Sequence, residues 1–260
     1  MPSVYAHTRM GRRMIPVLDA EIVSCIRSHS HLYELGLCGP DFLYFHNPLK
    51  PDWIFRLADS VHNAPGRDFF TPAARQLRLQ PDEGARAYLY GVLAHFTLDS
   101  CCHPFIHEMH DAGVAGHMEM EAEFDRWLLE QDGCPSPCTA KTAAHLRPDG
   151  GEAKKIARFY PRMTPELVQS SFRNYRVLLG LCAVPAHSLR RSLIASGLFS
   201  DKARQAMLLP AANPRCKTLT PEIYARYLQA EQCFPALMAQ LQELLRRGTA
   251  PGAEFDRVFG

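Results

Sequence analysis

Apolar residues recur at intervals of three and four along most of the chain, and runs in which apolar and polar residues alternate are absent. The first spacing is typical of amphipathic helices, whereas alternation is typical of strands. The sequence therefore predicts an all-α protein, a multi-helix bundle. The expected helices span residues 15–34, 51–62, 66–79, 82–103, 117–131, 138–146, 152–160, 164–183, 186–195 and 220–247.

Glycine, proline and other turn-forming residues divide the chain. They cluster at residues 39–41, 63–66 and 132–142. Because such clusters interrupt helices, the last one is the expected boundary between a first half, residues 1–131, and a C-terminal helical layer, residues 143–260. We expect both to belong to one domain over residues 1–260. The polar and proline-rich stretch 208–221 is expected to be a long loop and a candidate cover for a site.

The composition is that of a globular protein. Of the 260 residues, 47% are hydrophobic and 22% are charged, which argues against a disordered chain. The 29 basic and 27 acidic residues leave a net charge of +2, and no basic block stands out. We therefore expect no binding to long nucleic acids, since these require a basic surface.

Three features indicate a cytoplasmic protein. No apolar stretch approaches the roughly 20 residues that a membrane helix needs. The first residues lack the apolar core and the small-residue cleavage site of a secretory signal. The nine cysteines are odd in number and scattered, which is typical of reduced thiols.

Histidines are the first sign of chemistry, because six of the twelve lie in residues 62–117. His95, Asp99 and His103 follow one another at intervals of four. Four residues advance a helix by about 400°, so these side chains share one ridge. We expect the helix to end at His103, since Pro104 follows it.

His117 and Glu121 repeat this spacing in the next expected helix. A His/carboxylate pair four residues apart is more often a surface hydrogen bond than a metal site. Here, however, His95 and Asp99 lie in a strongly apolar segment, where an ionised carboxylate without a partner is costly. Because facing helices can present such pairs to shared cations, the two pairs together favour a metal site.

Further motifs accompany these pairs. The set comprises HxxxDxxxHP at 95–104, HxxxE at 117–121, GPD at 39–41, an isolated His62 and an early His7. In order and spacing these motifs resemble the zinc-dependent phospholipase C family, whose fold is an all-helical bundle shared with the P1-type nucleases. The resemblance covers about residues 3–131. It implies a metal cluster formed by His7, Asp41, His62, His95, Asp99, His103, His117 and Glu121.

The resemblance also implies how the ligands are shared. One ion would be bound by Asp41, His62, His95 and Asp99, and another by His103, His117 and Glu121. His7 would help to hold a third ion, with Asp99 bridging. Secreted members complete this third site with a processed N-terminal tryptophan, and no Trp lies near the start of this chain. We therefore expect two or three Zn²⁺ ions, two of them tightly held and the third weak or absent.

The ligands have alternative interpretations. His7 is also a candidate cap of the first helix, and Asp41 is a common type of turn residue. His62 lies at an expected helix end, where a cation suits the helix dipole.

Several neighbouring residues have more than one possible role. The aromatic run 42–45 is a candidate pocket wall or ordinary core, and Asp125 is a candidate partner that orients a ligand imidazole. His107 has no position in the family pattern and is expected on the surface or beside the ligands. Cys134 and Cys138 are a weak candidate pair for a disulfide or a metal.

The expected activity follows from the metal. Adjacent zinc ions lower the pKa of bound water toward about 7 and neutralise charge on phosphoryl oxygens. We expect a phosphoric diester hydrolase resembling phospholipase C, in which metal-activated water attacks a phospholipid or a related small phosphodiester and Asp41 acts as general base or orienting ligand. No nucleophile elbow and no P-loop is present. A nuclease or nucleotidase on the same scaffold and a non-catalytic metal-binding protein are the alternatives.

Overall fold

The computed structural model describes residues 4–48, 50–196 and 201–260, and no strand occurs within these ranges. The all-α prediction is confirmed. The helices are α1 (Val4–Met14), α2 (Ala20–Ser28), α3 (Ser30–Gly36), α4 (Trp53–His62), α5 (Gly66–Leu79), α6 (Glu83–Asp111), α7 (His117–Gln131), α8 (Gly150–Ala157), α9 (Pro165–Cys182), α10 (Leu189–Ala195), α11 (Asp201–Gln205) and α12 (Leu219–Arg247).

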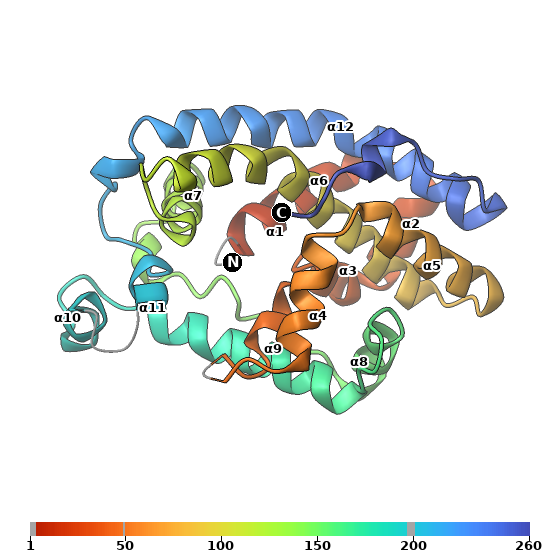
Figure 1. The fold of residues 1–260 in the computed structure, drawn as a ribbon, viewed down its shortest axis with the longest axis horizontal. Helices are drawn as coiled ribbons and strands as arrows, with labels where there is room; N and C mark the ends of the chain where they lie inside the picture. The colour runs from red at the N-terminus through yellow and green to blue at the C-terminus, as the bar shows by residue number, and fades with distance from the viewer. Residues whose placement is uncertain (1–3, 49, 197–200) are drawn as a thin grey trace.

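Helix α6 is the centre of the bundle. Asp82 caps its start by accepting a hydrogen bond from the backbone N–H of Ala85 at 2.9 Å. All but one of the residues from Gly84 to Ser100 are buried, as expected for a helix that is apolar on every side. Helices α1, α2, α3, α7 and α12 all pack against α6. Figure 1 shows α12 along one long side of the molecule and α9 along the opposite side.

One continuous cluster of buried side chains joins the two halves of the chain. It extends from Val4 in α1 to Phe259 near the C-terminus and includes Leu93 in α6 and Phe234 in α12. Because the halves share this core, we propose that residues 1–260 form a single domain.

Three helix predictions are wrong. The range 15–34 contains two helices, α2 and α3, which meet at His29, and it misses α1. Residues 138–146 form a 3₁₀ turn and further turns, since so short a segment gains little from helix propagation. Helix α6 continues through Pro104 to Asp111. The proline removes one helical hydrogen bond, but the packing of α6 against α7 and α12 outweighs that loss.

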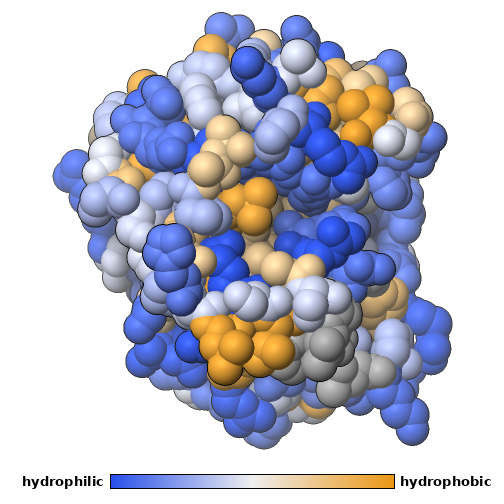
Figure 2. All heavy atoms as spheres, turned by 90° about the vertical axis from the view of Figure 1, so that its left-hand side faces the viewer, coloured by the Kyte–Doolittle hydropathy of each residue, from blue (hydrophilic) through white to orange (hydrophobic). Residues whose placement is uncertain are grey.

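One face of the molecule is mostly hydrophilic (Figure 2). Figure 2 looks onto the side where Figure 1 places α10 and shows hydrophilic residues over most of this face, a hollow near its middle and a few hydrophobic patches. In the described part of the chain, no helix is both long enough and apolar enough to span a bilayer.

Candidate metal centre

Four buried side chains from three segments form what we call the first cluster. Asp41 begins the 3₁₀ turn η2 (Asp41–Phe45), His62 ends α4, and His95 and Asp99 lie one turn apart on α6. An Asp41 Oδ1 atom lies 2.9 Å from His62 Nε2 and 3.7 Å from His95 Nε2. His95 Nε2 lies 2.9 Å from Asp99 Oδ2. One ligand atom from each residue falls within 4.8 Å of all the others, so a single ion can reach all four.

Backbone carbonyls orient the histidines of the first cluster. His62 Nδ1 lies 2.8 Å from the carbonyl oxygen of Ala58, and His95 Nδ1 lies 3.2 Å from that of Leu37. A carbonyl oxygen only accepts, so each Nδ1 must carry the proton and donate it. Each Nε2 is then left with a lone pair directed toward Asp41 and Asp99, the arrangement that metal-binding histidines usually show.

The loop before Asp41 approaches His95 closely. Gly39 has a φ of +51°, and a Cβ atom at this position would collide with the His95 ring. A residue with a side chain would therefore be strained and would displace the imidazole. This contact explains why the GPD sequence begins with glycine.

Three side chains form what we call the second cluster. His103 lies one turn after Asp99 on α6, while His117 begins α7 and Glu121 follows one turn later. Glu121 Oε1 lies 3.1 Å from His103 Nε2 and 3.4 Å from His117 Nε2. His103 Nδ1 donates to the carbonyl oxygen of Phe259 at 3.1 Å. The His117 side chain is 21% exposed, so the second cluster reaches solvent whereas the first does not.

Asp99 connects the two clusters. Its Oδ1 lies 3.7 Å from His103 Nδ1 and 3.3 Å from His7 Nε2. The His7 ring stacks on His95 with 4.2 Å between centroids. A cavity of about 20 Å³ lies among His7, Asp99, His103 and Glu121. A single water needs roughly 10–15 Å³, so the space beside His7 accommodates one water or one small ion.

Opposite charges within the centre shift the pKa values of their neighbours in favour of the ionised forms. Burial alone would raise the pKa of Asp99, but His103, His95 and His7 outweigh it and hold this pKa well below its usual range. Burial likewise opposes ionisation of Glu121, yet the neighbouring His117 and His103 lower its pKa. Burial would lower the pKa of His103, but Asp99 and Glu121 raise it to about 9. The carboxylates are thus ionised at neutral pH, and His103 must release a proton when it binds a metal.

Unsatisfied polar atoms test whether these residues fit a cation. His95 Nε2, Asp99 Oδ2, His117 Nε2 and Glu121 Oε2 are buried without a well-aligned hydrogen-bond partner among the described residues. Buried polar atoms normally have partners, and leaving several of them unsatisfied side by side is costly. A divalent cation would satisfy them together, and a set of imidazole and carboxylate donors is typical of zinc.

His7 does not cap the first helix. Helix α1 begins at Val4, and its free N–H groups on Tyr5 and Ala6 donate to the Asp125 carboxylate at 3.0 and 2.8 Å. The prediction that Asp125 orients a ligand imidazole is therefore wrong. Because this carboxylate binds the turn that carries His7, it fixes α1 against α7.

His107 lies beside the ligands, one of the two positions expected for it. Its ring stacks on His103 with 5.5 Å between centroids and lies 5.1 Å from the His117 ring. His107 also continues the four-residue ridge of α6, which was expected to end at His103. A cavity of about 420 Å³ opens onto this side of the second cluster. It is lined by Asp99, Ser100, His103, Pro104, His107, Arg257, Val258 and Gly260.

The aromatic run 42–45 serves both packing and the site. Phe42 is fully buried and stacks on Phe172 of α9 with 4.4 Å between centroids. Tyr44 lies 5.0 Å from the His62 ring. The core interpretation holds for Phe42, while Tyr44 borders a ligand of the first cluster.

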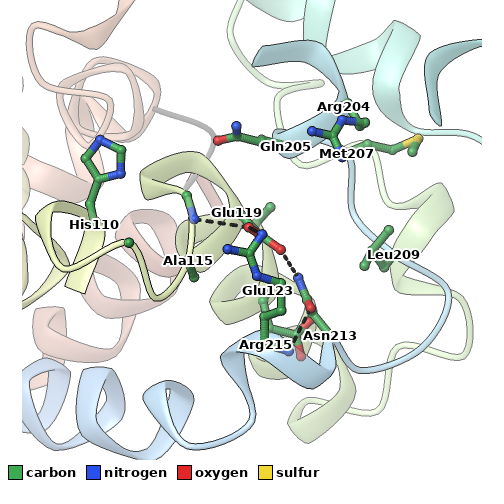
Figure 3. A pocket seen from close by; sticks show the side chains of 13 residues that line it. His110, Ala115, Glu119, Glu123, Arg204, Gln205, Met207, Leu209, Asn213 and Arg215 are labelled. Carbon is green, nitrogen blue, oxygen red and sulfur yellow. Dashed lines mark hydrogen bonds and ion pairs between the residues drawn. The ribbon is translucent and has the colours of Figure 1, made fainter. Parts of the chain in front are cut away.

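The stretch 208–221 contacts α7 at Glu119, and none of its residues lines the cavities beside the candidate ligands. Asn213 and Arg215 bind the Glu119 carboxylate at 2.8 and 3.1 Å (Figure 3). Together with α7 and α11 they enclose a cavity of about 360 Å³, which none of the eight candidate ligands lines. Cys134 and Cys138 form no disulfide and belong to neither cluster.

Comparison with known families gives one match. A family model described as zinc dependent phospholipase C matches residues 6–174. No curated protein and no solved structure shows a significant match. The matched region covers more than half of the chain and contains all eight candidate ligands, whereas residues 252–260 lie beyond it.

Proposed function

The chain belongs to the zinc-dependent phospholipase C family, and from this premise we propose that it is a zinc-dependent phosphodiester hydrolase resembling phospholipase C. The observation that carries the proposal is the convergence of two sets of ligand atoms, each within 4.8 Å, on either side of Asp99. Two ions bound by these sets would suit phosphoryl chemistry, because adjacent metal ions can stabilise both the attacking and the leaving oxygen.

We assign the eight residues to three roles. Asp41, His62, His95 and Asp99 hold one ion, His103, His117 and Glu121 hold a second, and His7 with Asp99 borders a weaker third position. When bound, zinc lowers the pKa of water toward about 7 and neutralises charge on phosphoryl oxygens. Asp41 is buried at the first cluster, where its carboxylate binds the ion and is the candidate to orient the attacking water or accept its proton.

The cavity beside the second cluster supports a small phosphodiester or a phospholipid head group as substrate. Its volume of about 420 Å³ lies in the range of roughly 300–1,000 Å³ that ligand pockets occupy. Asp99 and His103 line it, and Arg257 supplies a cation at its edge. An open position next to the ligands is typical of catalytic rather than structural zinc. A cytoplasmic location remains part of the proposal.

Hydrolysis assays with metal exchange test this function. We expect purified protein to hydrolyse p-nitrophenyl phosphorylcholine, to lose this activity with 1,10-phenanthroline and to regain it with Zn²⁺. Activity on bis-p-nitrophenyl phosphate and nucleotides alone would favour the nuclease or nucleotidase instead. A protein that holds two zinc ions and hydrolyses none of these esters would contradict the proposal and leave a binding role.

A further inference from the structure

The last residues of the chain return to the metal centre. After α12, the segment Gly252–Gly260 runs back toward α6, and Figure 1 shows the C-terminus near the middle of the molecule. Two backbone–backbone hydrogen bonds and one to a side chain anchor it. The N–H of Gly252 donates to Gln240 Oε1 at 2.9 Å, the N–H of Gly66 to the carbonyl of Arg257 at 2.8 Å, and the N–H of Gly260 to the carbonyl of His62 at 3.2 Å.

Two aromatic side chains hold this segment in place. Phe255 and Phe259 are fully buried. Phe255 contacts Phe70 of α5 with 5.3 Å between centroids, and Phe259 contacts Phe96 of α6 with 4.9 Å between centroids. Since these rings belong to the main core, the backbone at residues 259 and 260 has a defined position relative to α6.

That backbone meets His103. The Phe259 carbonyl accepts from His103 Nδ1 at 3.1 Å, which leaves His103 Nε2 facing Glu121. A Cβ atom on Gly260 would collide with the His103 ring. In the first cluster the corresponding carbonyls belong to Ala58 and Leu37, inside the region shared with the family. For His103 the carbonyl comes from outside that region.

We propose that the segment Gly252–Gly260 is a positioning element of the second ion site. The Phe259 carbonyl selects the tautomer of His103, and Gly260 permits the close approach that keeps the ring directed at Glu121. Partners of this kind are typically responsible for a 10- to 100-fold change in metal affinity. The inference rests on the zinc binding of the proposed function and is independent of the substrate. Residues 6–174 therefore do not complete the centre by themselves.

Gly260→Ala tests the proposal, with Gly150→Ala as its matched control. A Cβ on Gly150 meets no atom within 4 Å, so the same chemical change there is harmless. In a competition titration with a chromophoric chelator, we expect Gly260→Ala to weaken one of the two zinc ions about 10- to 100-fold and to leave the other unchanged. Gly150→Ala should bind both ions as the native protein does.

Nuclear magnetic resonance separates positioning from general loosening. Long-range ¹H–¹⁵N spectra of the zinc-loaded native protein should show His103 protonated at Nδ1, and Gly260→Ala should shift or lose this signal while the signals of His62 and His95 stay in place. Deletion of residues 259 and 260 should have the same effects, more strongly. If Gly260→Ala keeps both affinities and the His103 signal, the proposal is wrong. Hydrolysis is not measured, so failure here is distinct from failure of the proposed function.

Discussion

The two clusters differ in how deeply their ligands are buried and in where the carbonyls that orient their histidines come from. All four ligands of the first cluster are buried, whereas in the second cluster His117 is partly exposed and His103 lines a cavity. The histidines of the first cluster bond to carbonyls of α4 and Leu37, and His103 bonds to the distant Phe259. An enclosed site exchanges its ion slowly, while an open one can accept substrate. The comparison predicts that an ion at the first cluster would exchange more slowly than an ion at the second, which is the more open to solvent.

Replacement of Asp99 should have the largest effect, because this residue lies between the two clusters. It faces His95 in one cluster and lies near His103 and His7 on the other side. We expect Asp99→Asn to lose the ion of the first cluster, to weaken the second ion by removing a charge 3.7 Å from His103, and to reduce hydrolysis more than about 100-fold, because metal assistance supplies several kcal/mol. Zinc content by mass spectrometry and the phosphodiesterase assay measure this.

Asp19→Asn is the control for that variant, since Asp19 is exposed and makes no side-chain capping bond. It should retain both ions and full activity. An Asp99→Asn protein that keeps two tightly bound ions would contradict the assignment of Asp99 as a ligand of the first ion.

Removing one histidine from each cluster should separate the two ions. We expect His117→Ala to retain one zinc ion and lose at least about 10-fold in activity, since the first cluster is intact without it. His95→Ala should lose the ion of the first cluster and activity together. Zinc titration of the two variants under identical conditions compares them directly.

His187→Ala, which alters an exposed histidine, should change neither metal content nor activity. Equal loss of both ions from the two ligand variants would mean that the clusters bind cooperatively as one site.

Gly39→Ala sharpens the comparison without touching a ligand. The added Cβ would displace the His95 ring, and the positive φ disfavours any side chain. We expect about 10- to 100-fold weaker binding of the ion of the first cluster and normal binding of the other. In competition titrations, Gly39→Ala and Gly260→Ala should each weaken a different ion. If both variants weaken the same ion, the two sites are not positioned by separate segments.

The smallest effect concerns the far end of α6. Asp82 caps α6 and pairs with Lys155 of α8. Burial alone would raise its pKa, but the bond from Lys155 and that from the Ala85 N–H hold it below its usual range. Asp82→Ala should cost about 1 kcal/mol, which lowers Tm by about 2–4 °C, and leave both zinc affinities unchanged.

Thermal unfolding at several pH values checks the origin of that loss. A depressed pKa contributes stability above the unfolded value, near 3.9, and this contribution disappears as pH falls through the folded value. The difference in Tm between the native protein and Asp82→Ala should therefore shrink below about pH 4. A difference that is constant with pH would mean that the charge of Asp82 does not contribute.

Local patterns were sufficient for part of this architecture. The four-residue spacing of His95, Asp99 and His103 predicted one ridge on a buried helix, and the structure shows it. The division of the ligands into two sets came from the family resemblance, since spacing within one helix does not reveal which residues of other segments face it. Asp41 and His62 reach α6 only through tertiary packing.

Two parts of the site could not be predicted, for physical reasons. A proline usually ends a helix, but packing keeps α6 helical beyond Pro104. The ridge was therefore predicted to stop before His107. Phe259 is 156 residues away from His103 in sequence, and its contribution is a backbone carbonyl, which every residue carries. Neither helical periodicity nor residue type identifies such a contact.

Anomalous X-ray diffraction at the zinc absorption edge tests the central claim most directly. Crystals of the zinc-loaded protein should give one peak among Asp41, His62, His95 and Asp99 and a second among His103, His117 and Glu121. Crystals in which neither position scatters anomalously, or in which the bound zinc lies elsewhere in the molecule, would contradict a two-ion centre built on these helices.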